Sequence, residues 1–436
     1  MKTTKTMWVM LIALLTVTSC SETETGIDPE PGNDDQVSLG ITPNLKVDAG
    51  TKAVTKSVVS GETITYPVEQ FTSSDYAPGL GVLVTNSGTT GWYTPDGTEY
   101  TGHHIWYMGD EKGANWISIK EKKDTYKSTK ETPYYLTKEV GKVYAYYPYD
   151  PDLSLSINRE SDLKIPVTVL SSGKIDATAN NAKKYWKTNA WAATAKADLV
   201  NLSLSTEKDY LYFAGEEGRY VNNGRASGET PVASDADPDN KNEKNPGYKI
   251  NLDMKHAMAM ISFRVYDGGH LSDKDVNFTK FEIKNHTGGS NLFKTGDGKM
   301  ALTDGAITET STTTSLSRTV TNYILMRQID EGGTEGEHAF IATGTSTSSI
   351  NGKNVSRTVS AVIYPIINFG DNEIDVEVTL QESSGSSVVY PITLPGNAWE
   401  AGTNYIYTFS AGRNKLTIMD VAVEAWVDNE QDEIPL

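Results

Sequence analysis

Histidine side chains are the first candidates for metal binding or proton transfer in this sequence. Six histidines occur, and none falls in the H-E-x-x-H spacing by which a helix presents two imidazoles to zinc. His103 and His104 are adjacent, and neighbouring residues of a strand point to opposite faces, so they are not expected to chelate one ion. His256 lies in an apolar run, where we expect an imidazole satisfied inside a core strand. The histidines therefore predict no metal site.

Carboxylates are abundant but form no recognisable catalytic or calcium-binding motif. Asp235, Asp237 and Asp239 begin like an EF-hand loop, yet the central glycine and the final glutamate of such a loop are missing. The G-x-S-x-G elbow, the P-loop and the dinucleotide fingerprint are also absent. We predict that the protein is not an enzyme and uses no cofactor. A glycosidase pair among the many acids stays as a minor alternative, since sequence alone cannot select two of them.

The single cysteine, Cys20, follows a segment typical of a secretory signal. Lys2 and Lys5 give a positive start, residues 7–15 are apolar, and that stretch is too short to span a membrane. The run LLTVTSC, which ends at Cys20, is similar to a bacterial lipobox, in which the cysteine sulfur carries a lipid. We predict a lipoprotein signal peptide over residues 1–19 and lipidation of Cys20. The lipid would hold the chain to a membrane.

The charge balance excludes one class of partner. The chain has 39 Lys and Arg against 57 Asp and Glu, which gives a net charge of −18 and a pI near 4.8. Nucleic acid is therefore not an expected partner. Residues 21–36 are acidic, contain Gly and Pro, and predict a solvated tether.

Aromatic residues gather between positions 92 and 116. The candidates for stacking on a sugar or a protein ligand are Trp92, Tyr93, Trp106 and Trp116. Packing inside a β domain is the alternative interpretation, and we favour it.

The remaining elements are mostly β. Apolar runs and period-two alternation, bounded by turn residues, predict strands near residues 37–41, 80–84, 143–147, 201–204, 210–213, 257–265, 320–326, 359–364, 374–380, 405–409 and 416–426. One helix is expected near residues 177–197. A Gly-rich turn near residue 270 predicts a boundary between an N-terminal domain, 57–270, and a C-terminal domain, 271–436.

Four separate pieces of sequence together resemble one family. They are the lipobox at Cys20, VYAYYPY at 143–149, DYLYF at 209–213 before LDMKHAMAMISFRV at 252–265, and the ending WEAGTNYIYTFSAGRNKLTIMDVAVEAW at 399–426. In this order they resemble the fimbrillins of Bacteroidetes, the pilins of lipoprotein-derived type V pili. The resemblance implies two tandem transthyretin-like Greek-key β-sandwich domains. It also implies a cell-surface fimbria, reached through an outer-membrane lipoprotein precursor, with other pilus subunits as partners and host or bacterial surface ligands as further candidates.

In that family, proteolysis removes an N-terminal strand, and the vacated groove accepts a C-terminal strand of the next subunit. Val37, Leu39 and Ile41 fit the removable strand, within a lipidated tether and strand over residues 20–56. The small, polar segment that follows is suited to proteolysis, and Lys52 and Lys56 are its candidate cleavage sites. Family members are usually cut after Arg, but the first Arg here is Arg159, so cleavage after Lys or an uncleaved anchor are both open.

The C-terminal strand carries two alternations in different phases. Leu416 and Ile418 follow one phase, and Val421, Val423 and Ala425 follow the other, which predicts a bulge near Met419 and Asp420. Either half fits the donor strand. The alternative to a pilus subunit is an outer-membrane-anchored surface protein that binds glycans through its aromatic residues.

Overall fold

The structure is a computed structural model of the 436-residue chain. The described residues are 37–45, 80–86, 91–93, 104–109, 116–119, 133–150, 153–155, 159–177, 208–214, 219–223, 246–268, 271–272, 275–311, 313–329, 339–342 and 358–425. All of them belong to one compact unit, Gln36–Leu436. The helix expected near residues 177–197 and the strand expected at 201–204 lie outside or almost outside them.

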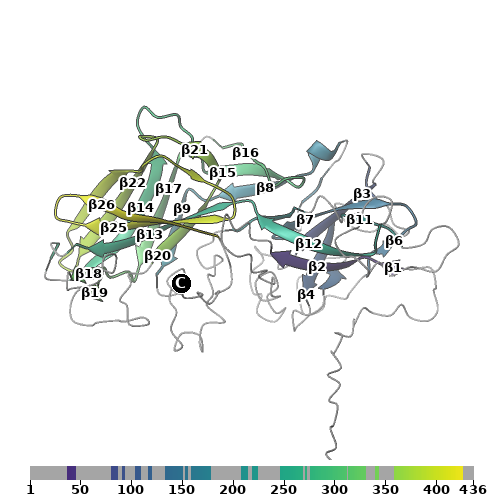
Figure 1. Ribbon diagram of the computed structural model, residues 1–436, viewed down its shortest axis with the longest axis horizontal. Helices are drawn as coiled ribbons and strands as arrows, with labels where there is room; N and C mark the ends of the chain where they lie inside the picture. Colours follow the sequence, from purple (N-terminus) through teal and green to yellow (C-terminus); the bar gives the residue numbers. More distant parts are fainter. Residues whose placement is uncertain are drawn as a thin grey trace, which may run out of the picture. The chain divides into compact units, whose positions relative to one another are not determined.

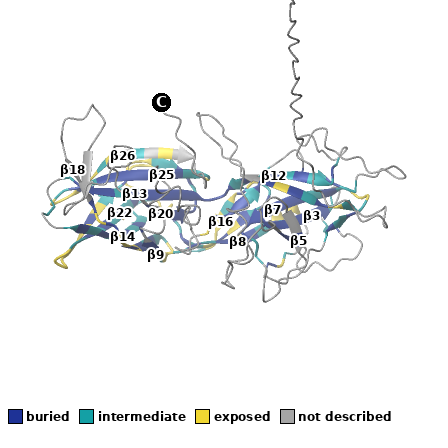
Figure 2. Ribbon diagram, turned by 90° about the horizontal axis from the view of Figure 1, so that it is seen from below, coloured by how far each residue is buried: buried dark blue, intermediate teal, exposed yellow. Residues whose placement is uncertain are grey.

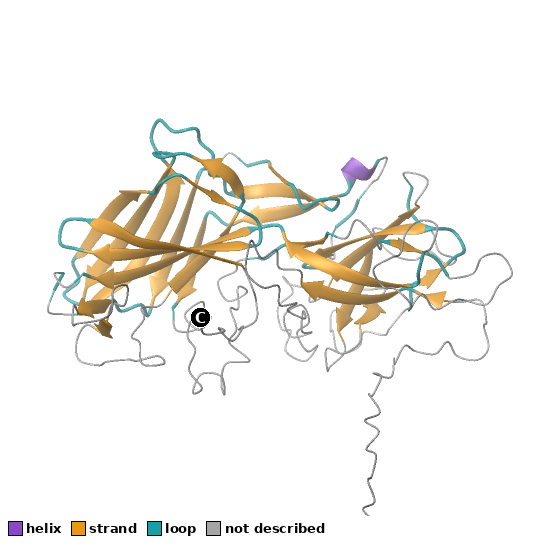
Figure 3. Ribbon diagram, viewed as in Figure 1, coloured by secondary structure: helices purple, strands orange, loops and turns teal. Residues whose placement is uncertain are grey.

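The regular elements of the described chain are strands, apart from one short 3-10 turn, as Figure 3 shows, and the mostly β prediction is confirmed. Up to residue 221 the elements are β1 (Val37–Ser38), β2 (Gly40–Leu45), β3 (Leu80–Asn86), β4 (His104–Gly109), β5 (Trp116–Ile119), β6 (Tyr135–Leu136), β7 (Gly141–Tyr147), a 3-10 turn η4 (Glu160–Asp162), β8 (Lys164–Val169), β9 (Ser172–Asp176), β10 (Leu211–Phe213) and β11 (Tyr220–Val221). From residue 249 they are β12 (Lys249–His256), β13 (Ala259–Asp267), β14 (Val276–Asn285), β15 (Gly296–Ala301), β16 (Ile307–Glu309), β17 (Ser315–Thr321), β18 (Met326–Ile329), β19 (Ala339–Ala342), β20 (Thr358–Ile363), β21 (Ile366–Phe369), β22 (Ile374–Glu382), β23 (Ser387–Thr393), β24 (Asn397–Trp399), β25 (Thr403–Ala411) and β26 (Leu416–Ala425).

The first large sheet collects strands from the N-terminal half together with β12. Its order is β2-β12-β10-β7-β3-β4-β5, with β11 also paired to β7 (Figure 1). β12 alternates strictly between buried and half-buried residues, which gives the sheet one apolar face. That face and its neighbours form a cluster of buried side chains, the N-terminal core, whose members run from Leu39 to Met254.

Two further sheets build a second core. Their orders are β19-β18-β13-β25-β26, with β20 also paired to β13, and β23-β22-β14-β17-β9. Phe263 of β13 meets Phe281 of β14 edge to face, with 4.9 Å between ring centroids, so the two sheets pack through their apolar faces. The smaller sheets are β16-β15-β8, β21-β24 and β1-β6.

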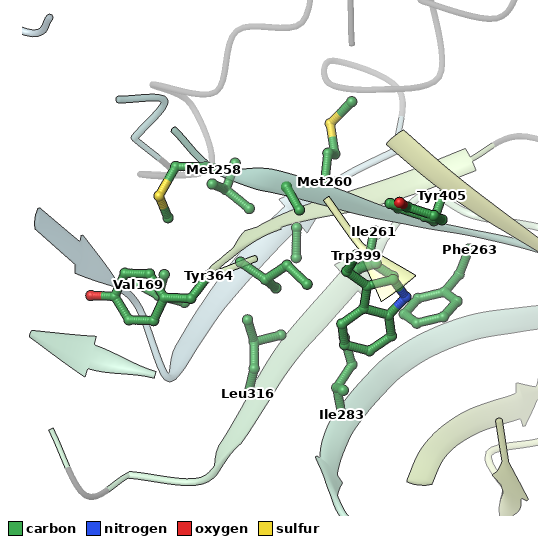
Figure 4. Packing of buried hydrophobic residues seen from close by; sticks show 14 of the residues in the cluster. Val169, Met258, Met260, Ile261, Phe263, Ile283, Leu316, Tyr364, Trp399 and Tyr405 are labelled. Atoms are coloured by element: carbon green, nitrogen blue, oxygen red, sulfur yellow. The ribbon is translucent and has the colours of Figure 1, made fainter. Parts of the chain in front are cut away.

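Trp399 fills the centre of the second core. Figure 4 shows its indole beside Ile283 and Phe263. Its Nε1 donates a hydrogen bond of 2.9 Å to the Tyr407 hydroxyl, and its ring lies edge-on to Phe369 at 4.8 Å. A buried indole needs such a partner for its N–H, so the hydrogen bond fixes the ring where the sheets meet.

The predicted division near residue 270 stays a prediction. β8, β9 and β13 precede that residue, and they pair with β15, β17 and β25, which follow it. The strand expected over residues 320–326 is wrong in its extent, because β17 ends at Thr321 and β18 begins at Met326. Asn322 between them adopts a φ of 58°, the left-handed region, which interrupts the extended chain. Among the described residues, no helix is long and apolar enough to cross a membrane.

Candidate assembly strands

The predicted removable strand is present as an edge of the first large sheet. β2 pairs with β12 in parallel, from Gly40 opposite Lys249 to Leu45 opposite Met254. Just before it, Val37 of β1 pairs with Leu136 of β6 in an antiparallel arrangement. Pro43 lacks an N–H, and an edge strand tolerates this because one side of its backbone has no neighbour. The segment 37–45 therefore joins two sheets while remaining at an edge.

Alternate side chains of this strand fill the N-terminal core. Leu39 is 3% exposed, Ile41 is 7% exposed, and both belong to the core cluster. Pro43 is also buried, whereas Thr42 between them is exposed. At roughly 1.5 to 3 kcal/mol for each fully buried aliphatic side chain, Leu39 and Ile41 together contribute about 3 to 6 kcal/mol of gross burial. Removal of this strand would expose that apolar groove to water.

Two tyrosine-containing segments hold the backbone of Leu39. Its N–H donates to the carbonyl oxygen of Tyr134 at 2.8 Å, and its own carbonyl oxygen accepts the hydroxyl of Tyr107 at 2.8 Å. Sequence reasoning missed both, because Tyr107 is 68 residues away along the chain and no local pattern links them. These bonds replace the backbone partners that a strand at an edge otherwise lacks.

The predicted donor strand is also an edge. Among the described strands, β26 pairs only with β25, in an antiparallel arrangement, at the end of its sheet. The register shifts by one residue, so that Thr408 faces Asp420 while Phe409 faces Ile418. Met419 is the extra residue, and the predicted bulge near Met419 and Asp420 is confirmed.

Burial falls along β26 from Leu416 to Val423. Leu416 is 6% exposed, Ile418 and Val421 are half-buried, and Val423 is 58% exposed. Figure 2 shows the contrast between the dark blue β25 and the lighter β26 beside it. The apolar side chain of Val423 is thus largely exposed to solvent in this subunit.

The predicted lipidation site, Cys20, and the predicted cleavage sites, Lys52 and Lys56, are outside the described residues. Arg159, the first arginine of the chain, precedes the turn η4, and its side chain is 76% exposed beside Asp162, with 3.1 Å between Nε and the carboxylate. Its side chain is therefore accessible to solvent.

The aromatic candidates for ligand binding are largely internal. Tyr93 is 4% exposed and Trp106 is 1% exposed, stacked on Tyr149 with 5.1 Å between ring centroids. Burial raises the pKa of the Tyr93 hydroxyl, which bonds to Thr137. Trp92 is half-buried, and the side chain of Trp116 lies outside the described residues. The interpretation as core packing holds for Tyr93 and Trp106.

The histidine expected inside a core strand is buried at the end of β12. Nδ1 of His256 lies 2.8 Å from a carboxylate oxygen of Asp209, and both side chains are under 10% exposed. A paired, buried imidazole of this kind agrees with the expectation that His256 is satisfied inside a core strand. Within the described part of the chain, no three His, Cys, Asp or Glu side chains lie close enough to hold a metal ion.

Comparison with known proteins gives a partial family match. Residues 232–426, which include β12 to β26, match the model of the fimbrillin-like family. This part of the chain is therefore similar to fimbrillin-like proteins. No protein of curated function matches the chain.

Solved structures from Bacteroides are similar in extent. A candidate cell adhesion protein from Bacteroides ovatus is 15% identical, with a TM-score of 0.45, and the alignment covers 91% of this chain and 99% of that one. A fimbrial protein from Bacteroides vulgatus is 12% identical, with a TM-score of 0.45, covering 90% of this chain and 100% of that one.

Proposed function

We propose that this protein is a structural and adhesive subunit of a cell-surface fimbria that polymerises by donor-strand exchange. In this proposal the precursor is exported as an outer-membrane lipoprotein through Cys20 and cut after Lys52 or Lys56. The segment 37–45 then leaves its groove, and the C-terminal strand of another subunit enters it.

One observation carries the proposal. The segment 37–45 places Leu39 and Ile41 in the N-terminal core, although it pairs along β2 only with β12. A strand that lies at an edge and fills a core is the element whose loss creates an acceptor, because both apolar pockets and backbone groups of β12 lose their partners. The fimbrillin-like match supports the same reading.

The donor side of the proposal has its own support. β26 is an edge strand at the other end of the described chain, and it exposes apolar side chains that could be buried elsewhere. Filling the groove of a second subunit restores hydrogen bonds and burial together, so the joint is expected to be long-lived.

Truncation of the C-terminal strand tests this mechanism. A chain that lacks Val421–Leu436 keeps the buried Leu416 and is expected to be secreted and cut at its N-terminal site, but to form no polymer. Formation of filaments by the truncated chain would show that the donor strand is elsewhere. The intact chain, cut by the same protease, is the control.

A surface glycan-binding protein is less well supported. That alternative needs accessible aromatic faces, and Tyr93 and Trp106 are enclosed by the protein. We retain no catalytic role in the proposal.

A further inference from the structure

We propose that the bulge at Met419 divides β26 into a retained segment, Leu416–Ile418, and a donor segment, Val421–Ala425, which alone leaves β25 to enter a second copy of this chain. This inference rests on the proposed polymerisation and identifies the part of the strand that moves.

The register of β26 against β25 shows which face of the sheet its apolar residues occupy. Ala411 faces Leu416 and Phe409 faces Ile418 before the bulge, whereas Tyr407 faces Val421 and Tyr405 faces Val423 after it. Directly opposed residues of an antiparallel pair share a face, so the apolar residues of both segments lie on the core side of the sheet. The bulge keeps them there, at the cost of a three-residue step from Ile418 to Val421.

The groove that segment 37–45 fills requires apolar residues at a regular spacing. β2 and β12 pair from Gly40 to Leu45 without a register shift, and the buried residues of the segment 37–45 recur at every second position, Leu39, Ile41 and Pro43. An incoming strand must therefore offer apolar residues at the same two-residue spacing. Val421, Val423 and Ala425 have that spacing. A strand that spans the bulge does not, because the step at Met419 turns one of its two segments away from the pockets.

Burial in the monomer distinguishes the two segments. Leu416 is 6% exposed and belongs to the second core, so its release would open a cavity in the core of its own subunit. Val423 is 58% exposed although it lies opposite Tyr405, which is 4% exposed. Ile418 and Val421 both lie half-buried against the second core, so the two segments differ at Leu416 and Val423. Release of Val423 loses little burial, whereas release of Leu416 would expose a core residue.

The bulge also supplies the point of flexure. A classic bulge leaves one residue unpaired and bends its strand, so backbone pairing is already interrupted at Met419. Met419 is 45% exposed, and rotation about it meets less packing than rotation at Leu416. The donor segment Val421–Ala425 has five residues, close to the length of the six-residue β2 that it would replace.

Reversible cross-links test which segment moves. The chain from residue 21 onward contains no cysteine, because Cys20 is the only one in the sequence. Thr403→Cys with Ala425→Cys pins the donor segment to β25, and Ser410→Cys with Thr417→Cys pins the retained segment, since each pair is directly opposed. Opposed Cα atoms of antiparallel strands are about 4.5 to 5.5 Å apart, within the range of disulfides. Each variant is compared in oxidised and reduced form, after the same proteolytic activation.

The expected result is a reversible block from one cross-link only. Oxidised T403C/A425C should give at least about a tenfold loss of multimers, restored by reductant, while oxidised S410C/T417C polymerises like its reduced form. Polymer growth by oxidised T403C/A425C, or a block by oxidised S410C/T417C, would overturn the inference. If the wild-type chain and both reduced variants stay monomeric after cleavage, the proposed polymerisation itself is wrong, and this inference falls with it.

Discussion

Val423 lies directly opposite Tyr405 in the register of β26 and β25, yet Val423 is 58% exposed and Tyr405 is 4% exposed. Two residues on one face of one sheet therefore differ because the facing sheet covers β25 and leaves the end of β26 open. An apolar strand end with no cover in its own subunit is a surface that association can bury.

A charge at Val423 separates assembly from stability. Val423→Asp removes an apolar residue that the monomer hardly buries, so the free energy of unfolding should change by about 0.5 kcal/mol or less. Polymer formation should fall at least about tenfold, because the carboxylate would have to enter an apolar groove. Denaturant unfolding and multimer ladders on gels measure the two effects. Efficient polymerisation by this variant would contradict the donor assignment.

Leu416→Asp is the matched comparison within the same strand. Here the carboxylate enters the core of the monomer, so the variant should lose several kcal/mol of stability. A loss no larger than that of Val423→Asp would show that the two ends of β26 are equally open.

The hydroxyl of Tyr107 should control how firmly the N-terminal strand is held. Tyr107→Phe leaves the Leu39 carbonyl oxygen without this donor, which should cost about 1 to 3 kcal/mol and speed the release of segment 37–45 after cleavage. Release is followed as loss of the N-terminal fragment on size-exclusion chromatography. Tyr323→Phe is the control, since the Tyr323 hydroxyl bonds to the Val265 backbone in the second core. It should lower stability without changing the rate of release, and an equal acceleration in both variants would count against the assignment.

Trp106 should matter for folding and not for ligand binding. Trp106→Ala removes an indole that is 1% exposed and is expected to cost about 3 to 5 kcal/mol. Ile367→Ala, at a side chain that is 89% exposed, should change stability by less than about 0.5 kcal/mol. Saturable quenching of tryptophan fluorescence by polysaccharides, lost in a folded Trp106→Ala protein, would favour the glycan-binding alternative instead.

Tyr210 should make stability fall at alkaline pH. Burial raises the pKa of its hydroxyl from 10.0 to about 12. Below pH 10 the hydroxyl is neutral in both states, and its contribution is fully present. Between about pH 10 and 12 the unfolded chain ionises while the folded chain does not, so stability falls by up to about 1.4 kcal/mol per pH unit.

Tyr210→Phe tests that assignment. The variant should show a shallower decline of unfolding free energy over this pH window than the wild type, whatever its stability at neutral pH. Identical slopes would mean that Tyr210 does not titrate as its burial requires.

Strongly apolar strands were predictable from the sequence, and polar ones were not. The runs at 80–84, 143–147 and 374–380 correspond to β3, β7 and β22, because continuous or alternating apolar residues are the signature of buried strands. β15 was not predicted, because its sequence GDGKMA buries only Gly298 and Met300 and so shows no apolar run. Its pairing with β8 and β16 is set by tertiary contacts. The helical composition near 177–197 has no counterpart among the described residues.

The assembly strands show the same division. The phase change at Met419 is a local pattern, so the bulge could be read directly from the alternation of Leu416, Ile418, Val421 and Val423. The uneven burial of β26 could not, because it depends on how far the other sheet reaches. Nor could the contacts of Tyr107 and Tyr134 with Leu39, which join segments distant in the chain.

Limited proteolysis tests the central claim most directly. Residues 21–436 are treated with small amounts of trypsin, and N-terminal sequencing is combined with denaturing gels of unheated and heated samples. The account predicts a cut after Lys52 or Lys56, followed by a heat-sensitive ladder of multimers; sequencing distinguishes this from a cut at the exposed Arg159. Resistance at both lysines, or a clean cut there that leaves only monomers, would contradict it.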